Sequence, residues 1–243
     1  MDDIRSLTGE LLLRAWEEGK EKHALARGLI LLSLALAEGD LQKLGQLSLG
    51  ERNYLLLRLH QRTFGPVLNG FGICPQCSAQ LEFTAPVAGL IEHLQSQRCE
   101  GPMIWEENGR QYQLRPVTSS DLLALLESPD AIDGQKQLLR RCLTVSGEPL
   151  AGEEPHATPS VVERFEQLHA PAEMTCVVQC AACFGRETLE LDIAQFVWVE
   201  IRNAAKRLLA QVHELAWAYG WSEEAILRMS PHRRNAYMEM LSG

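Results

Sequence analysis

Two Cys-x-x-Cys motifs are the residues best suited to chemistry in this chain. Their four thiolates, Cys74, Cys77, Cys180 and Cys183, match the ligand set of a tetrahedral structural zinc site. We therefore expect one Zn²⁺ bound by both motifs. About a hundred residues separate the pairs, more than in compact zinc-binding motifs. Because the entropy of loop closure grows only with the logarithm of length, a folded insertion can lie between them.

Two other interpretations of the motifs stay open. A thioredoxin-like redox pair needs a preceding strand and a helix that begins at the second cysteine. Here alternating, strand-like runs follow both motifs, Gln80–Phe83 and Thr188–Leu191, as in a zinc-ribbon knuckle. Alternatively, the cysteines simply pack in a core, since free cysteine is among the most buried residue types.

Three of the seven cysteines lie outside the motifs, and Cys99 among them has no evident partner. Cys142 lies in an apolar helical stretch and is expected in the core. Cys176 belongs to a valine-rich strand and either packs inward or substitutes as a metal ligand. The odd count and the paired close spacings argue against a disulfide framework and for a reducing compartment.

Composition excludes several functional classes. The 243 residues, 46% of them hydrophobic, predict a soluble globular protein with one large core or two modest ones. The apolar run Gly28–Ala37 is too short to span a bilayer, and the acidic start does not suit a signal peptide, so we expect a cytoplasmic protein. A net charge of −9 opposes a general nucleic-acid surface.

Catalytic patterns are absent from the sequence. There is no glycine-rich phosphate loop, nucleophile elbow or His-Glu-x-x-His run, and the histidines are dispersed. A zinc ion held by four thiolates has no open position for water, so it would hold structure. We therefore expect a protein that is not an enzyme.

The fold class expected is α+β, mainly α, with helical ends around a split zinc ribbon. The expected parts are 1–70, N-terminal helices; 71–100 and 172–193, the ribbon; 101–171, an insertion; and 194–243, C-terminal helices. Asn108-Gly109 predicts a hairpin between Met103–Glu107 and Arg110–Arg115 in the insertion. Ser146–Thr158 is expected to be a loop.

Helical periodicity and capping residues define the helices. They are expected at Leu7–Trp16, His23–Ala37, Leu41–Leu47, Glu51–Arg62, Leu122–Glu127, from Ser128-Pro129 to Leu143, after Thr158-Pro159, at Ala194–Tyr219, after Ser222 and after Ser230-Pro231. Ala194–Tyr219 is the longest and ends at Gly220. We expect the metal to fix these C-terminal helices relative to the front half of the chain.

Several segments resemble one family, the baseplate hub assembly chaperones of T-even-type phages and related contractile injection systems. They are Arg62–Pro66, the first knuckle with Leu81–Phe83, Leu114–Leu122, the second knuckle, Phe196–Ile201, Leu208-Leu209, Val212–Ala216, Ala218–Glu223, Ile226-Leu227 and Ser230–Tyr237. The resemblance extends from about Leu29 to Leu241 and transfers no catalytic motif. It implies a cytoplasmic, non-enzymatic chaperone or adaptor that binds baseplate hub or other tail proteins.

The C-terminal helices are the expected binding face for these partners. Trp, Tyr and Arg are enriched among interface hot spots. The candidates are Trp217, Tyr219, Trp221, Arg233, Arg234 and Tyr237. Alternatively, the aromatic residues, together with Trp198, pack in the core. Two further functions stay open: a structural component retained in the finished baseplate, and a zinc-ribbon regulator that binds nucleic acid.

Overall fold

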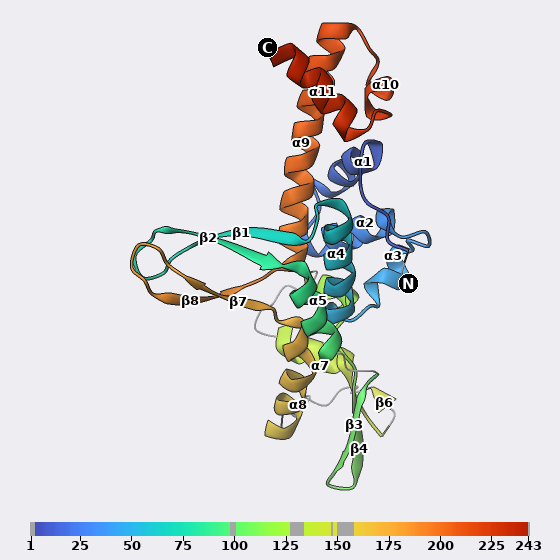
Figure 1. Ribbon diagram of the computed structural model, residues 1–243. Helices are drawn as coiled ribbons and strands as arrows, with labels where there is room; N and C mark the ends of the chain where they lie inside the picture. Colours follow the sequence, from blue (N-terminus) through green and yellow to red (C-terminus); the bar gives the residue numbers. More distant parts are fainter. Residues whose placement is uncertain (1–2, 98–100, 127–133, 147, 150–157, 243) are drawn as a thin grey trace.

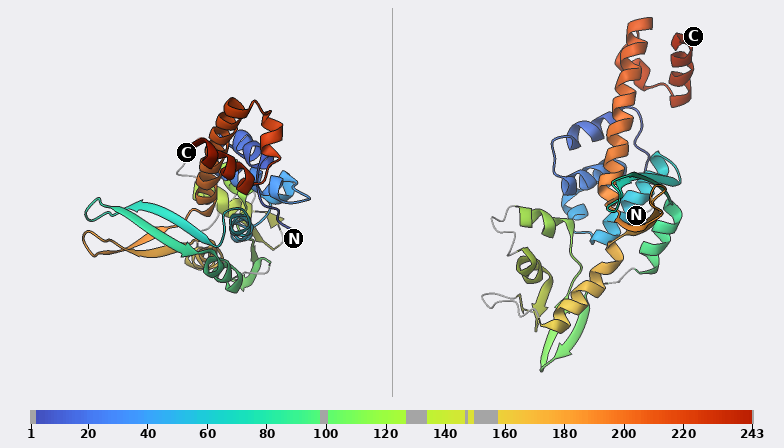
Figure 2. Two further views of the ribbon diagram at one scale, coloured as in Figure 1. Left: turned by 45° about the horizontal axis from the view of Figure 1, so that its top comes forward. Right: turned by 90° about the vertical axis from the view of Figure 1, so that its left-hand side faces the viewer.

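The structure is a computed structural model that describes residues 3–97, 101–126, 134–146, 148–149 and 158–242. It is an α+β fold and mainly helical, which confirms the expected class. One long helix, α9 (Ile193–Tyr219), runs through the molecule, and two β-hairpins project from its side as an arm (Figure 1). Helices at both ends of the chain pack along α9 above the arm, and the helices of the insertion lie below the arm (Figures 1 and 2).

The main core lies between α9 and the N-terminal helices α1 (Glu10–Gly19), α2 (Ala24–Ala35) and α4 (Leu49–Thr63). Apolar residues at three- and four-residue steps give α9 one buried face, which is the pattern that predicted the helix. Its members are Val197, Ile201, Ala205, Leu208, Val212 and Leu215. α2 is apolar almost all round and is therefore buried on most sides.

Capping residues begin three of the helices within two residues of the expected starts, at Leu41, Leu49 and Ile193, and the predicted Gly220 ends the longest one. Asp192 accepts a hydrogen bond from the backbone N–H of Gln195 at the start of α9, and Gly220 ends it with φ 66°. α3 (Leu41–Gly45) begins at the Asp40 cap, and α4 begins at a capping box in which Ser48 and Glu51 bond reciprocally.

The start of α1 differs from the prediction. The helix begins at Glu10 because Gly9, with φ 55°, ends a preceding extended segment. That segment pairs with the end of α2 through the Ile4–Leu36 bridge, and Leu7 is buried in the main core without being helical. Apolar periodicity alone does not separate an extended segment that packs on the core from a first helical turn.

The insertion has its own core below the arm. Its four-stranded sheet has the order β3 (Met103–Glu107), β4 (Arg110–Leu114), β5 (Leu143–Val145) and β6 (Glu148–Pro149). Asn108 and Gly109 have φ 53° and 72°, which confirms the predicted hairpin. The core residues are Leu114, Val117, Leu139, Cys142, Leu143, Val161 and Leu168. Cys142 is therefore in a core, as expected.

Helices α6 (Ser119–Leu126), α7 (Gly134–Cys142) and α8 (Pro159–His169) complete the insertion, and the short helix η2 (Ala170–Ala172) leads out of it. α8 begins at the predicted Thr158-Pro159 cap. The expected helix start at Ser128-Pro129, Cys99 and most of the loop expected at 146–158 lie outside the described residues. Glu148–Pro149 within that loop pairs as β6.

The C-terminal end consists of α10 (Glu223–Leu227), capped by Ser222, and α11 (Pro231–Ser242). Both begin where expected, and both pack on the end of α9. Helix α5 (Val87–Ser96) lies in the segment expected to belong to the ribbon, but its buried residues join the main core. Across the described ranges no helix has the length and apolar character needed to cross a bilayer.

Candidate metal centre

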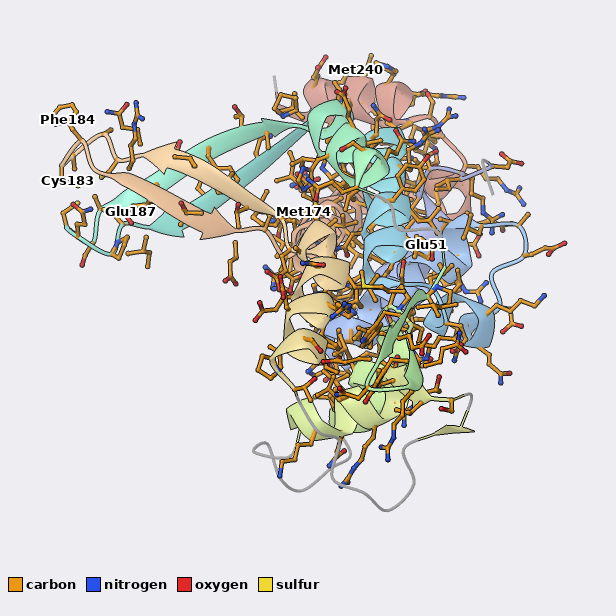
Figure 3. The ribbon with its side chains drawn as sticks, turned by 90° about the horizontal axis from the view of Figure 1, so that it is seen from below. Glu51, Met174, Cys183, Phe184, Glu187 and Met240 are labelled. Carbon is orange, nitrogen blue, oxygen red and sulfur yellow. The ribbon has the colours of Figure 1, made fainter. Side chains whose placement is uncertain are left out.

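Each Cys-x-x-Cys motif forms the tip of a β-hairpin. β1 (Val67–Ile73) and β2 (Gln80–Pro86) flank the first motif, and β7 (Thr175–Gln179) and β8 (Arg186–Glu190) flank the second. Both pairs are antiparallel, and β2 lies against β7. The two hairpins extend together from the helical body, and the motifs meet at the far end of the arm, where Figure 3 labels Cys183 and Phe184.

The four sulfur atoms have the spacing of a tetrahedral metal site. The Sγ–Sγ distance is 3.7 Å between Cys74 and Cys183 and 3.6 Å between Cys77 and Cys180. All four ligand atoms lie within 4.8 Å of one another. Metal–sulfur bonds of about 2.3 Å in a tetrahedron place the sulfurs about 3.8 Å apart, so these residues fit a single metal ion such as zinc.

Both knuckles have the same backbone geometry. The N–H of Cys74 donates to the Ala79 carbonyl at 2.8 Å, and the N–H of Cys180 donates to the Gly185 carbonyl at 2.9 Å. The residue after each motif, Ser78 or Phe184, has φ near 60° and donates its N–H back to the first cysteine. Two equivalent turns therefore present two thiols each toward a common point.

A small core holds the hairpins together behind the sulfurs. Its buried members are Cys74, Leu81, Val178 and Cys180, with Phe83, Cys176 and Leu189 packed against it. Gly70 is required here, because a Cβ at this position would lie 2.1 Å from the Phe83 ring. Cys176 packs inward, which is one of the two roles expected for it. It is not part of the four-sulfur cluster.

The electrostatics of the cluster favour a bound cation. Backbone N–H groups of Cys183 and Ala182 lower the pKa of Cys180 to about 7, because they stabilise a thiolate. At Cys77 the Ala79 N–H also favours the thiolate, but burial and the neighbouring thiols outweigh it and raise the pKa of Cys77 to about 12. A bound cation would stabilise the Cys77 thiolate that burial and the neighbouring thiols disfavour.

This geometry does not match a thioredoxin-like redox pair. Each motif lies in a turn between antiparallel strands, and no helix begins at Cys77 or Cys183. Cys77 and Cys183 are exposed, whereas Cys74 and Cys180 are buried, so the cluster is half-shielded at the tip of the arm. Simple burial of all four cysteines in a core is therefore also contradicted.

The six residues predicted to bind partners lie at the opposite end of α9 from the start of the arm. Tyr219, Trp221 and Tyr237 contact one another through their rings, with Tyr219 and Trp221 stacked at 4.5 Å. Arg234 is 5% exposed and donates to the Met229 carbonyl and to the Gln211 side chain of α9, so it links α11 to α9.

The remaining two candidates, Arg233 and Trp217, are exposed, and the side chain of Trp217 is 87% exposed. The guanidinium of Arg233 lies over the Tyr237 ring. Trp198, by contrast, is buried in the main core. The binding role of the six candidates stays a prediction.

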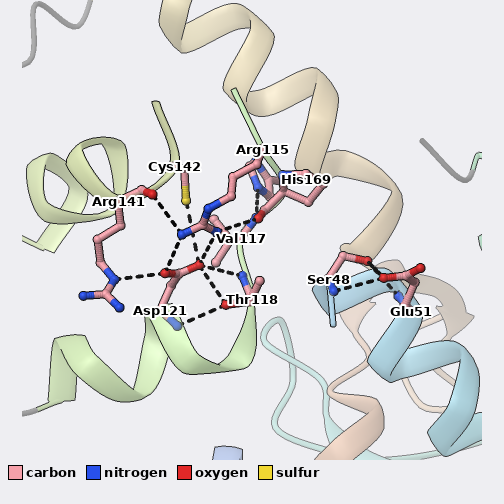
Figure 4. Close-up of polar contacts among 10 residues, drawn as sticks. Ser48, Glu51, Arg115, Val117, Thr118, Asp121, Arg141, Cys142 and His169 are labelled. Carbon is pink, nitrogen blue, oxygen red and sulfur yellow. Dashed lines mark hydrogen bonds and ion pairs between the residues drawn. The ribbon is translucent and has the colours of Figure 1, made fainter. Parts of the chain in front are cut away.

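The sequence did not predict a second polar cluster, which is centred on Asp121 in the insertion (Figure 4). Arg115 donates two hydrogen bonds to its carboxylate, at 2.7 and 2.9 Å, and Arg141 donates a third at 2.9 Å. Thr118 donates through both its backbone N–H and its hydroxyl. Only the Thr118–Asp121 cap has a local sequence signal; Arg115 directly follows β4, and Arg141 lies in α7.

Comparisons of the chain with protein-family models, with curated proteins and with solved structures found no match. Any function of this chain is therefore inferred from its geometry and from the sequence resemblance. The geometry provides a four-sulfur centre at the end of an arm and a group of aromatic side chains at the end of the long helix.

Proposed function

We propose that this chain is a non-enzymatic assembly chaperone or adaptor for the baseplate hub of a phage tail or contractile injection system. In this proposal it acts in the cytoplasm, binds tail proteins, and carries one structural Zn²⁺ in a split zinc ribbon. The observation that carries the binding role is the exposure of large apolar side chains at both ends of the molecule.

On the arm, the outward face of β1 carries Phe71 and Ile73, and the knuckle of the second hairpin carries Phe184, which is 74% exposed. At the other end, Trp217 and Met240 are exposed on α9 and α11. Exposed apolar side chains of this size are typical of protein–protein contact surfaces, where aromatic residues supply much of the binding energy.

In this proposal the metal ion is structural and not catalytic. Four sulfurs in a tetrahedron suit Zn²⁺ or iron, and zinc is the common choice in structural sites. A full set of protein ligands leaves no position for water or substrate. The ion would hold two hairpins that are too short to be stable as isolated pairs of strands. It would thereby keep Phe71, Ile73 and Phe184 in a fixed arrangement.

The class of client comes from the resemblance to the hub chaperone family. A hub protein that awaits its neighbours has apolar surfaces and unpaired strand edges, which associate wrongly if left uncovered. A chaperone with its own exposed aromatic residues can cover such surfaces until the correct neighbour competes for them. An adaptor would use the same contacts but remain in the particle.

Affinity capture of the tagged full-length chain from the producing cell tests this proposal. We expect tail proteins in stoichiometric amounts, identified by mass spectrometry. A Phe71→Ser/Ile73→Ser variant should lose most of this recovery. A Glu82→Gln/Thr84→Ser variant, changed at polar positions on the same outward strand face, should keep it.

Purified particles separate the two forms of the proposal. A chaperone is absent from finished baseplates, whereas a structural component is present. Capture of nucleic acid in place of tail proteins would support the alternative function, a zinc-ribbon regulator that binds nucleic acid. Recovery of no tail protein with the wild type, or equal recovery with both variants, would overturn the proposed contact surface.

A further inference from the structure

The exposed face of α9 between Arg202 and Trp217 carries an unusual set of side chains. Arg202, Lys206, Ala210, His213 and Trp217 are all exposed and follow one another at steps of four, four, three and four residues. These steps place them on a single stripe along the helix. Arg207 is exposed beside the stripe. The opposite face of α9 is buried in the main core.

The cations of this stripe have no anionic partner in the part of the chain that the structure describes. Among the residues that the structure describes, Arg202, Lys206 and Arg207 form no ion pair or side-chain hydrogen bond. No Asp or Glu occurs from residue 201 to residue 213, although the whole chain has a net charge of −9. Just before the stripe, Glu200 turns inward to His60, with 2.7 Å between Oε2 and Nε2.

Like charges four residues apart destabilise a helix, so Arg202 and Lys206 do not serve the stability of α9. The neighbouring elements leave the stripe uncovered. α11 contacts a different side of α9, where Gln211 donates to Asn235 and accepts from Arg234. The base of the arm meets α9 through the Phe83–Phe196 ring contact, before the stripe begins. Figure 1 shows α9 continuing past the arm toward α10 and α11.

We propose that this stripe is the docking surface for an acidic amphipathic helix of a partner protein. At 1.5 Å per residue the stripe is about 23 Å long, which matches roughly four turns of a partner helix. Carboxylates at i, i+4 spacing on that helix would pair with Arg202, Lys206 and Arg207. An apolar side chain at its end would cover Trp217.

A partner helix fits better than nucleic acid does. The stripe combines its cations with an apolar end, and the exposed carboxylate of Glu214 lies next to it, where it would repel phosphates. This inference rests on the proposed function and specifies it, because it names the chemistry of the client surface that α9 would recognise. At the C-terminal end, it places the contact on the stripe and on Trp217 instead of on the buried Arg234 and the stacked rings, and it leaves the arm contact as proposed.

A synthetic peptide tests the inference. The probe is a fluorescent 20-residue helix with glutamates at i, i+4 positions on one face and leucines beside them, and its anisotropy is measured with the full-length metal-loaded protein. We expect saturable binding that weakens with added salt. An Arg202→Glu/Lys206→Glu/Arg207→Glu variant should weaken binding at least tenfold, and Trp217→Ser at least threefold.

A matched variant controls for net charge. Lys22→Glu/Lys43→Glu/Arg110→Glu makes the same charge change at exposed positions on other elements and should bind the probe within twofold of wild type. Circular dichroism checks that all variants are folded. A probe with lysines in place of the glutamates should not bind. Hydrogen exchange should show probe-dependent protection within residues 199–218 only.

Several outcomes would overturn the inference. They are no binding of the acidic probe, equal weakening by both triple variants, and tighter binding of a 20-base-pair DNA duplex that the first triple variant abolishes. Because the probe is synthetic, such a failure leaves the capture of tail proteins standing. Conversely, probe binding without capture of tail proteins would remove the proposed function and keep the docking surface.

Discussion

Asp121 shows how one buried carboxylate organises the insertion. Its side chain is almost fully buried, yet it accepts hydrogen bonds from Arg115 just after β4, from Thr118 just before α6 and from Arg141 in α7. Burial alone would favour the neutral acid, but the bonds from Arg115, Thr118 and Arg141 outweigh it. They hold the pKa of Asp121 well below its usual range, so the group is a carboxylate at neutral pH.

We expect Asp121→Asn to destabilise the protein by about 2 kcal/mol, because the amide cannot accept the charged bonds of two arginines. The loss is smaller than for a fully buried ion pair, since both guanidinium groups are partly exposed. Urea unfolding measures this loss in the free energy of unfolding. The control is Asp40→Asn at the α3 cap, where Asn caps equally well and the change should be a few tenths of a kcal/mol. Equal effects of the two substitutions would contradict this role.

His169 gives stability a dependence on pH near neutrality. Its Nε2 accepts from the Val117 N–H at 2.8 Å, and its Nδ1 lies 2.6 Å from the Phe165 carbonyl, so the neutral ring is required. Burial lowers the pKa of His169 below the ordinary 6.5, although the Phe165 carbonyl and Glu173 oppose this shift. The stability from this ring is therefore present above pH 6.5 and lost as pH falls through the lowered pKa.

We expect the urea midpoint of the wild type to fall between pH 7.5 and pH 5. The Asp121 contribution does not interfere, because the pKa of Asp121 is lowered from 3.8 and its effect is lost only in more acidic solution. His169→Gln should be less stable than wild type at pH 7.5 but should change less on acidification. If the urea midpoints of the wild type and of His169→Gln fell equally with pH, other groups would cause the pH dependence of stability.

At the level of elements, we expect the two hairpins to depend on a bound metal ion and the helices to be independent of it. Cys183→Ser removes an exposed ligand without leaving a cavity, so we expect loss of the bound metal and protease sensitivity confined to the arm. Cys176→Ser, at a half-buried thiol outside the cluster, should keep one metal ion per chain. Elemental analysis of both purified variants and the wild type measures this. Retention of metal by Cys183→Ser would contradict the proposed ligand set.

The arm shows which elements the sequence could predict. The alternating runs after each motif were recognised and form parts of β2 and β8. β1 was not predicted, because Gly70 and Gly72 weaken a strand pattern. Their role is visible only in three dimensions, where the Phe83 ring occupies the space that a side chain at Gly70 would need. Convergence of the four cysteines followed from residue type alone.

The helices were predicted best where a periodic apolar face and caps coincide. α9 was placed to within one residue, from its buried face and from Gly220. Exposure of single aromatic residues was not predictable, since Trp198 and Trp217 occur in the same helix with opposite environments. The Asp121 cluster was missed for a related reason: its arginines lie 6 and 20 residues away and meet the carboxylate only after folding.

The molecule as a whole has a main core, an insertion core and a small arm core. α9 packs directly against α1, α2 and α4, so the position of the C-terminal helices does not depend on the metal alone, contrary to the expectation from sequence. The division of the chain into four parts stays a prediction, although the insertion has its own core, as that division implies.

The order in which the four cysteines are synthesised determines when a metal ion could bind to them. Cys77 and its partner Cys180 are 103 positions apart, so at about 5–20 residues per second the ribosome makes the second thiol pair about 5–20 seconds after the first. During that interval the growing chain contains only the first two thiols, which cannot form a four-ligand metal site. Full coordination must wait until the insertion and the second hairpin have left the exit tunnel. A metal ion would therefore be captured only after both hairpins and the insertion between them have been synthesised.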